Sequence, residues 1–161
     1  MLNKTPALDE AVPDFSAGMT GPASFSLSAQ KGKNIVLYFY PKDNTPGCTA
    51  QSIGFRDLYA EFQNTNTEIF GISRDSLKSH DNFRTKFDLP FPLISDVDES
   101  VCALFDVIKS KKMYGKPVRG IERSTFLIDP AGRMVKEWRK VSVPGHVDEV
   151  LQAVEQLNRN K

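Results

Sequence analysis

A cysteine at the start of a predicted helix is the residue of this sequence best suited to do chemistry. Cys48 follows a Thr-Pro-Gly turn in DNTPGCTAQSIGF, residues 43–55, and an apolar run precedes that turn. Free N–H groups and the positive end of a helix stabilise an anion, so this position favours the reactive thiolate. Pro46 and Gly47 suit the start of a helix, because proline fixes φ and glycine lets the backbone approach closely. The sequence therefore predicts a nucleophilic thiolate at Cys48.

Helical spacing adds a requirement for a nearby cation. Cys48 precedes Phe55 by seven residues, so its sulfur is expected on the apolar face of the helix. Burial opposes the ionisation of a thiol. A reactive Cys48 therefore needs an arginine or lysine from elsewhere in the chain. On these residues alone a small buried cysteine that only packs stays open as the alternative.

The elements that would position Cys48 alternate between strands and helices. We expect strands in an N-terminal hairpin (13–17 and 24–29), at 35–40, 67–73 and 91–95, and in a second hairpin (124–129 and 133–140). We expect helices over 48–63, from Ser79 to before Pro90, after Asp98 (a short one) and after Gly145. This order predicts an α/β protein with the thioredoxin topology: a central mixed β-sheet flanked by helices, with an N-terminal β-hairpin. We expect residues 1–161 to form a single domain.

The composition excludes several classes of protein. The chain is 40% hydrophobic and 25% charged with a formal net charge of +1, which gives no overall attraction to nucleic acid or to a membrane surface. No segment approaches the roughly 20 apolar residues of a membrane span, and the N-terminus lacks a signal-peptide pattern, so we expect a cytoplasmic protein. Two cysteines without a CxxC pair and two histidines without ligand spacing predict no metal site.

One motif around the cysteine is specific enough to suggest a family. Pro41, Thr45 and Cys48 in PKDNTPGC match the pattern PxxxTxxC, and FPLISD, YGK, GIERSTFLID, EW and VPGHVDEVL support the match. The chain thus resembles the peroxiredoxins, in particular the bacterioferritin comigratory protein (Q-type) subfamily, from about residue 10 to the C-terminus. The resemblance implies a thioredoxin-like fold and a cysteine-based peroxidase that needs no metal or haem.

The resemblance also implies roles for individual residues. Cys48 would be the peroxidatic cysteine, whose thiolate attacks a peroxide oxygen and becomes a sulfenic acid. Thr45 would hydrogen-bond the substrate oxygens, Pro41 would shield the sulfur, and Arg123 would be the essential arginine that stabilises the developing charge. Gln51, one helical turn after Cys48, is expected to orient the arginine by hydrogen bonding, and a solvated helix residue is its alternative.

The chain departs from the family at the resolving cysteine. Many Q-type relatives carry it five residues after the peroxidatic one, where this chain has Ile53, and others place it in the next helix, where this chain has Phe83 and Arg84. Only Cys102 is left, and we expect a thiol that packs, with a resolving role as the alternative. The resulting hypothesis is a one-cysteine mechanism. The alternative is a two-cysteine mechanism resolved by Cys102.

The expected partners are a peroxide and an external thiol reductant: thioredoxin, glutaredoxin or glutathione. We expect a monomer, with a weak dimer as the alternative. A thiol–disulfide exchange protein on the same fold is disfavoured by the missing CxxC pair, and a chaperone-like binding module by the complete motif. The basic run KSKKMYGKPVR (109–119) is interpreted as a solvated loop, although it could also dock an acidic reductase. His80 and His146 lack catalytic partners nearby in the sequence.

Overall fold

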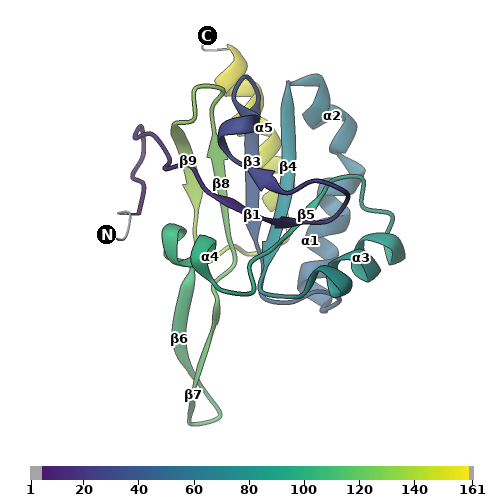
Figure 1. The fold of residues 1–161 in the computed structure, drawn as a ribbon, viewed down its shortest axis with the longest axis vertical. Helices are drawn as coiled ribbons and strands as arrows, with labels where there is room; N and C mark the ends of the chain where they lie inside the picture. The colour runs from purple at the N-terminus through teal and green to yellow at the C-terminus, as the bar shows by residue number, and fades with distance from the viewer. Residues whose placement is uncertain (1–4, 160–161) are drawn as a thin grey trace.

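A seven-stranded mixed sheet with helices on both faces forms the centre of the molecule (Figure 1). The computed structural model describes residues 5–159. The elements are β1 (Ser16–Met19), β2 (Phe25–Ser26), η1 (Ser28–Gln30), β3 (Asn34–Phe39), α1 (Pro46–Asp57), α2 (Tyr59–Asn64), β4 (Thr67–Ser73), α3 (Leu77–Lys86), β5 (Leu93–Ser95), α4 (Ser100–Phe105), β6 (Ile108–Met113), β7 (Lys116–Ile121), β8 (Ser124–Ile128), β9 (Met134–Trp138) and α5 (His146–Arg159). The strand order in the sheet is β2-β1-β5-β4-β3-β8-β9.

Strand direction agrees with the expected thioredoxin topology. Strands β3, β4 and β5 run parallel, while β8 and β9 form an antiparallel hairpin beside β3. Strands β1 and β2 form the N-terminal hairpin that the sequence predicts, and β1 pairs antiparallel with β5. Parallel strands need helical crossovers, and α1–α2 and α3 supply them.

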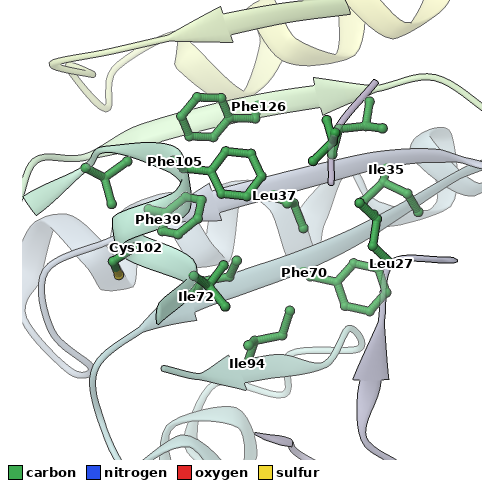
Figure 2. Packing of buried hydrophobic residues seen from close by; sticks show 14 of the residues in the cluster. Leu27, Ile35, Leu37, Phe39, Phe70, Ile72, Ile94, Cys102, Phe105 and Phe126 are labelled. Atoms are coloured by element: carbon green, nitrogen blue, oxygen red, sulfur yellow. The ribbon is translucent and has the colours of Figure 1, made fainter. Parts of the chain in front are cut away.

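The central strand β3 divides the core into two halves. All six of its residues are buried, as expected for a continuous apolar run covered on both faces. Leu37 and Phe39 point into a cluster that also holds residues of α4, whereas Val36 and Tyr38 point into a cluster with residues of α1, α2, α3 and α5. Figure 2 shows the α4 side, where Leu37, Phe39, Phe70, Phe105 and Phe126 pack together.

The structure corrects three details of the expected elements. The helix expected over 48–63 is broken: α1 ends at Asp57, its C-cap Leu58 leaves the helical region with a φ of −104° and a ψ of 8°, and α2 follows. Helix α3 begins earlier than expected, because Ser76 is its N-cap and accepts a hydrogen bond from the Ser79 amide. For α4, the buried Asp96 accepts from the Val101 and Cys102 amides, while the expected cap Asp98 accepts only from Ser100.

The basic run at 109–119 is not a loop. Strands β6 and β7 pair antiparallel as a separate two-stranded ribbon that projects from the body of the molecule (Figure 1). Tyr114 and Gly115 form its turn with positive φ values of 53° and 77°, which matches the backbone of tight hairpin turns. The ribbon is nevertheless solvated as expected, and the Tyr114 side chain is 98% exposed.

Among residues 5–159, no helix combines the length and the apolar character that crossing a membrane requires.

Candidate active site

Cys48 lies in the first turn of α1, as the sequence predicts. Thr45 is the N-cap and Pro46 occupies the first turn, so the chain turns into the helix just before the cysteine. The buried residues of α1 are Cys48, Gln51, Ser52 and Phe55, spaced as one helical face. Cys48 is only 1% exposed. The thiol is thus held at the positive end of a helix and within the core, which is the situation that calls for a neighbouring cation.

Arg123 supplies that cation from the segment just before β8. Its Nη2 donates to the Cys48 sulfur at 3.3 Å, across 75 positions of sequence. Its Nη1 donates to Oε1 of Gln51 at 2.6 Å. Gln51 is fully buried, so it is not the solvated helix residue of the alternative interpretation. The Arg123 guanidinium therefore bridges the Cys48 sulfur and the buried Gln51 amide. These two hydrogen bonds fix the orientation of the guanidinium.

The other residues of the PKDNTPGC stretch lie in the loop before α1 and in its first turn. A Cβ added to Gly47 would lie 3.1 Å from the Arg123 Nη2, so glycine leaves the room that the guanidinium occupies. The Thr45 hydroxyl donates to the Lys42 carbonyl at 2.9 Å instead of capping α1, and the lone pairs of its oxygen stay available for another donor. Pro41 is exposed in the loop between β3 and α1. The structure thus places the predicted site residues on one loop, one helix turn and one strand start.

The sequence did not predict two buried polar contacts near this site. Asp43, in the loop before α1, bonds to His80 of α3 at 2.7 Å across 37 positions. The His146 ring at the start of α5 lies 2.8 Å from the Thr125 hydroxyl. Burial, with a contribution from Arg123, lowers the pKa of His146 to about 4, so the ring is neutral at pH 7. No sequence spacing signals either contact, because each joins separate elements.

Tyr38 and Ser52 add a neutral polar contact beside the cysteine. The two hydroxyls lie 2.9 Å apart and both are buried. Burial raises the pKa of Tyr38, and the nearby charges of Asp43 and Cys48 add to the rise, so the phenol stays protonated. The group contributes a hydrogen bond and no charge to the surroundings of Cys48.

Cys102 lies on the opposite side of the sheet from Cys48. It belongs to the cluster with Phe39 and Phe105, as Figure 2 shows, whereas Cys48 belongs to the cluster with Tyr38. Cys102 is fully buried, and burial together with a hydrogen bond to Asp96 raises its pKa well above the ordinary value. Both cysteines are free thiols. The surroundings of Cys102 are those of a packing thiol.

Among the described residues, Asp43, Asp75 and His80 bring possible metal-ligand atoms within 4.8 Å of one another. Hydrogen bonds already occupy these atoms: Asp43 binds His80, and Asp75 accepts from the Ser73 hydroxyl and the Asp43 amide. This donor set is satisfied within the protein and does not fit a cation. A surface cavity of about 400 Å³ adjoins the group and is lined by Asp43, Asn44, Ser76, Lys78, Ser79, Asn82, Phe83 and Lys86.

Comparison with known proteins gives one consistent result. Residues 8–137 match the AhpC/TSA family. Peroxiredoxin Bcp of Xanthomonas campestris pv. campestris is 52% identical over 147 residues, covering 91% of this chain and 92% of that protein. Peroxiredoxin Bcp of Bacillus subtilis is 46% identical over 151 residues, covering 94% and 96%.

A solved structure extends the similarity to the fold. The Xanthomonas campestris bacterioferritin comigratory protein, studied as trapped intermediate and ligand complexes of alkyl peroxide reduction, superposes with a TM-score of 0.88 at 49% identity, covering 97% of this chain and 99% of that one. The expectations of a thioredoxin-like fold and of a peroxidase are therefore confirmed. The family match spans most of the chain, the relatives are of nearly equal length, and Arg123 contacts Cys48 at the start of α1. This chain therefore belongs to the AhpC/TSA family and, within it, to the Bcp or Q-type peroxiredoxins, which are thiol-dependent peroxidases.

Proposed function

We propose that this peroxiredoxin reduces hydrogen peroxide and organic hydroperoxides through Cys48 alone, and that an external thiol completes the cycle. The observation that carries the proposal is the 3.3 Å approach of the Arg123 guanidinium to the Cys48 sulfur in the first turn of α1. This cation offsets the cost of ionising a buried thiol. Gln51 and Gly47 are supporting residues, because one holds the guanidinium and the other leaves space for it.

In the first half-reaction the Cys48 thiolate attacks one peroxide oxygen and the O–O bond breaks. The sulfur becomes a sulfenic acid, and the second oxygen leaves as hydroxide or alkoxide, which takes up a proton. Negative charge moves from sulfur to the departing oxygen, so the donors of Arg123 and the N–H groups of the first turn of α1 stabilise the transition state more than the ground state. The Thr45 hydroxyl orients the substrate oxygens, and Pro41 shields the sulfur from bulk water.

In the second half-reaction an external thiol attacks the sulfenic sulfur, giving a mixed disulfide and water. A second thiol then releases Cys48 and leaves as a disulfide, so the two electrons that the peroxide gained come from two thiols. Thioredoxin, glutaredoxin and glutathione are the candidate reductants. The place of Cys102 behind the sheet supports an external thiol, because a disulfide needs Cα atoms within about 7 Å of each other.

The test is steady-state peroxide consumption by the wild type, Cys48→Ser and Cys102→Ser, with glutathione plus glutaredoxin in one series and thioredoxin in the other. We expect no turnover for Cys48→Ser and near wild-type turnover for Cys102→Ser with the active reductant. Loss of turnover in Cys102→Ser, with Cys48 still reacting with peroxide, would refute the one-cysteine mechanism. An internal disulfide after one equivalent of peroxide, seen by mass under non-reducing conditions, would refute it as well.

We further infer that the chain works as one domain and as a monomer in the cytoplasm. Among the described residues, the large hydrophobic side chains that are exposed are scattered over the N-terminal segment, α3, the β5–α4 loop and the ribbon: Leu8, Leu77, Val97, Tyr114 and Val118. Stable homodimer interfaces usually gather such side chains in one apolar patch. Sedimentation at the monomer mass of 18.0 kDa is expected for both reduced and oxidised protein. A dimer in either state would contradict the inference.

A further inference from the structure

The loop that carries Thr45 is tied to the rest of the molecule by one buried carboxylate. Asp43 lies two residues before Thr45, and its side chain is 3% exposed. Its Oδ1 accepts from the Tyr40 hydroxyl at 2.6 Å. Its Oδ2 accepts from the Ser79 hydroxyl at 2.8 Å and lies 2.7 Å from Nδ1 of His80. Three side chains thus converge on a single carboxylate of the loop.

The partners of His80 determine where its protons lie. The ring is completely buried, and its Nε2 lies 2.9 Å from the Ile94 carbonyl oxygen. A carbonyl oxygen only accepts, so Nε2 carries a proton. Nδ1 is hydrogen-bonded to the carboxylate of Asp43, to which two hydroxyls also donate. The contacts therefore describe a buried histidine–carboxylate pair in which both ring nitrogens have a partner.

This pair joins three separate parts of the fold. His80 belongs to α3, its Nε2 bonds to β5, and its Nδ1 bonds to the loop between β3 and α1. The backbone of the loop is held as well, because the Asp43 amide donates to Asp75 at 2.9 Å. A further contact, from Lys86 to Asn44 at 3.2 Å, is exposed. Removing one member of a buried hydrogen-bonded pair leaves the other member without its partner, whereas an exposed contact contributes little.

We propose that His80 is a positioning residue of the peroxidase reaction, acting through Asp43 on the loop that places Thr45. The inference rests on the proposed role of Thr45 at the peroxide. The Thr45 hydroxyl bonds to the Lys42 carbonyl, and Asp43 lies between these two residues, so the orientation of the hydroxyl follows the backbone that Asp43 anchors. His80 touches no reacting atom. It holds the substrate-binding side of the site in place, while α1 carries the sulfur and, through Gln51, holds the Arg123 guanidinium.

The experiment compares two reactions of the same sulfur in a Cys102→Ser background, where Cys48 is the only thiol. One is the rate constant for oxidation of Cys48 by hydrogen peroxide in a single turnover, and the other is its rate of alkylation by iodoacetamide. Alkylation depends on the nucleophilicity and access of the sulfur but not on an oriented peroxide. For His80→Leu we expect the ratio of the peroxide rate to the alkylation rate to fall about tenfold or more, since small displacements of aligned groups have effects of this size.

Matched variants separate positioning from loss of stability. His80→Asn, which keeps a donor toward Asp43, is expected to recover part of the ratio. Lys86→Ala removes the exposed contact, and Val101→Ala destabilises the core on the other face of the sheet; both are expected to stay within about twofold of the parent ratio. If His80→Leu does not fold, Asp43→Asn removes the charge at nearly constant shape, and the same fall is expected.

An unchanged ratio in folded His80→Leu or in Asp43→Asn would overturn the positioning role, and so would an equal fall in Val101→Ala. Failure of the proposed function looks different, because Cys48→Ser would then still consume peroxide and the role of His80 would fall with it. If peroxide consumption requires Cys48 but the ratio of the peroxide rate to the alkylation rate is unchanged in these variants, only the role of His80 is overturned.

Discussion

At the scale of single residues, the site that we propose keeps a buried thiol close to one cation. Cys48 is nearly inaccessible, and the Arg123 guanidinium that approaches it is itself held by Gln51. Because Gln51 is buried, the bond operates in a medium of low dielectric, where it is stronger than in water. The arrangement therefore depends on close steric fit as well as on charge.

The glycine beside the cysteine tests that fit. In Gly47→Ala the new Cβ would approach Nη2 of Arg123 to 3.1 Å and push the guanidinium away from the sulfur. We expect the rate of peroxide reduction to fall about tenfold, while alanine in a helix raises stability by up to about 1 kcal/mol relative to glycine. Single-turnover oxidation and thermal unfolding measure the two effects. A variant that keeps the wild-type rate would show that the guanidinium moves aside without consequence.

His146 gives stability a dependence on pH. Its pKa is lowered from 6.5 in the unfolded chain to about 4 in the folded protein. Between these values the unfolded chain binds more protons, so the free energy of unfolding falls as the pH drops from about 6.5 to about 4, by roughly 2 to 3 kcal/mol in total. Hydrogen bonds from Arg119 and Arg74 lower the pKa of Glu99 to about 2. The contribution of Glu99 to stability is therefore lost only below its ordinary pKa of 4.5, which lies below the pH range of His146.

Denaturant unfolding at several pH values measures this effect, with His146→Gln as the control. Glutamine is neutral at all these pH values and can still hydrogen-bond to Thr125. We expect the variant to lose the slope between pH 4.5 and 6.5 and to keep the slope below pH 4.5. An unchanged slope in the upper range would assign the dependence to other groups.

The sequence was sufficient to predict that Arg123 and Gln51 accompany Cys48, but not the contact between Asp43 and His80. Cys48, Thr45 and Arg123 were predicted because a motif fixes their types and spacing. Asp43 and His80 carry no such signal, since their contact spans 37 positions and depends on how α3 packs against the loop. Polar residues that join separate elements can be recognised only once the elements are in place.

At the scale of elements, the close packing of α1 against α5 can be tested at a glycine. A Cβ at Gly54 would lie 2.9 Å from Cγ2 of Val147. Overpacking costs about 1–3 kcal/mol, and the helix propensity of alanine offsets up to about 1 kcal/mol of it, so we expect Gly54→Ala to destabilise the protein by up to about 2 kcal/mol. In a Val147→Ala background the same change should be neutral or stabilising. Equal effects in the two backgrounds, measured by chemical unfolding, would disprove the steric explanation.

The elements that were predicted well are those whose pattern is local. Strand β4 and helix α5 were found because an apolar run or stripe shows in consecutive residues. The break at Leu58 was missed, because the apolar spacing continues across it into Tyr59 and Phe62. The β6–β7 ribbon was missed because lysines and an arginine interrupt its few apolar residues and most of β7 is exposed, so no apolar alternation marks the strands.

At the scale of the whole molecule, the sheet separates the two thiols, and we expect this separation to decide what happens to the oxidised protein without reductant. Cys48 and Cys102 lie in the two different halves of the core. With excess peroxide and no thiol, we expect Cys48 to gain further oxygen atoms and the activity to be lost irreversibly, since no second thiol traps the sulfenic acid. Intact-mass analysis over time follows the added oxygen, and Cys102→Ser is expected to behave identically. A loss of two hydrogens in the wild type would instead reveal an internal disulfide.

Trp138 is the sole tryptophan of the chain, and its place makes it an optical probe of the site. Its ring packs edge-on against His146 at 5.7 Å between centroids, and its Nε1 donates to Glu149. His146 in turn contacts Thr125, two residues after Arg123. Excitation of this one indole reports on the junction of β8, β9 and α5 without any attached dye. Emission recorded while peroxide is mixed in stopped flow follows this junction in real time, and its acid titration reports the charge of the neighbouring imidazole.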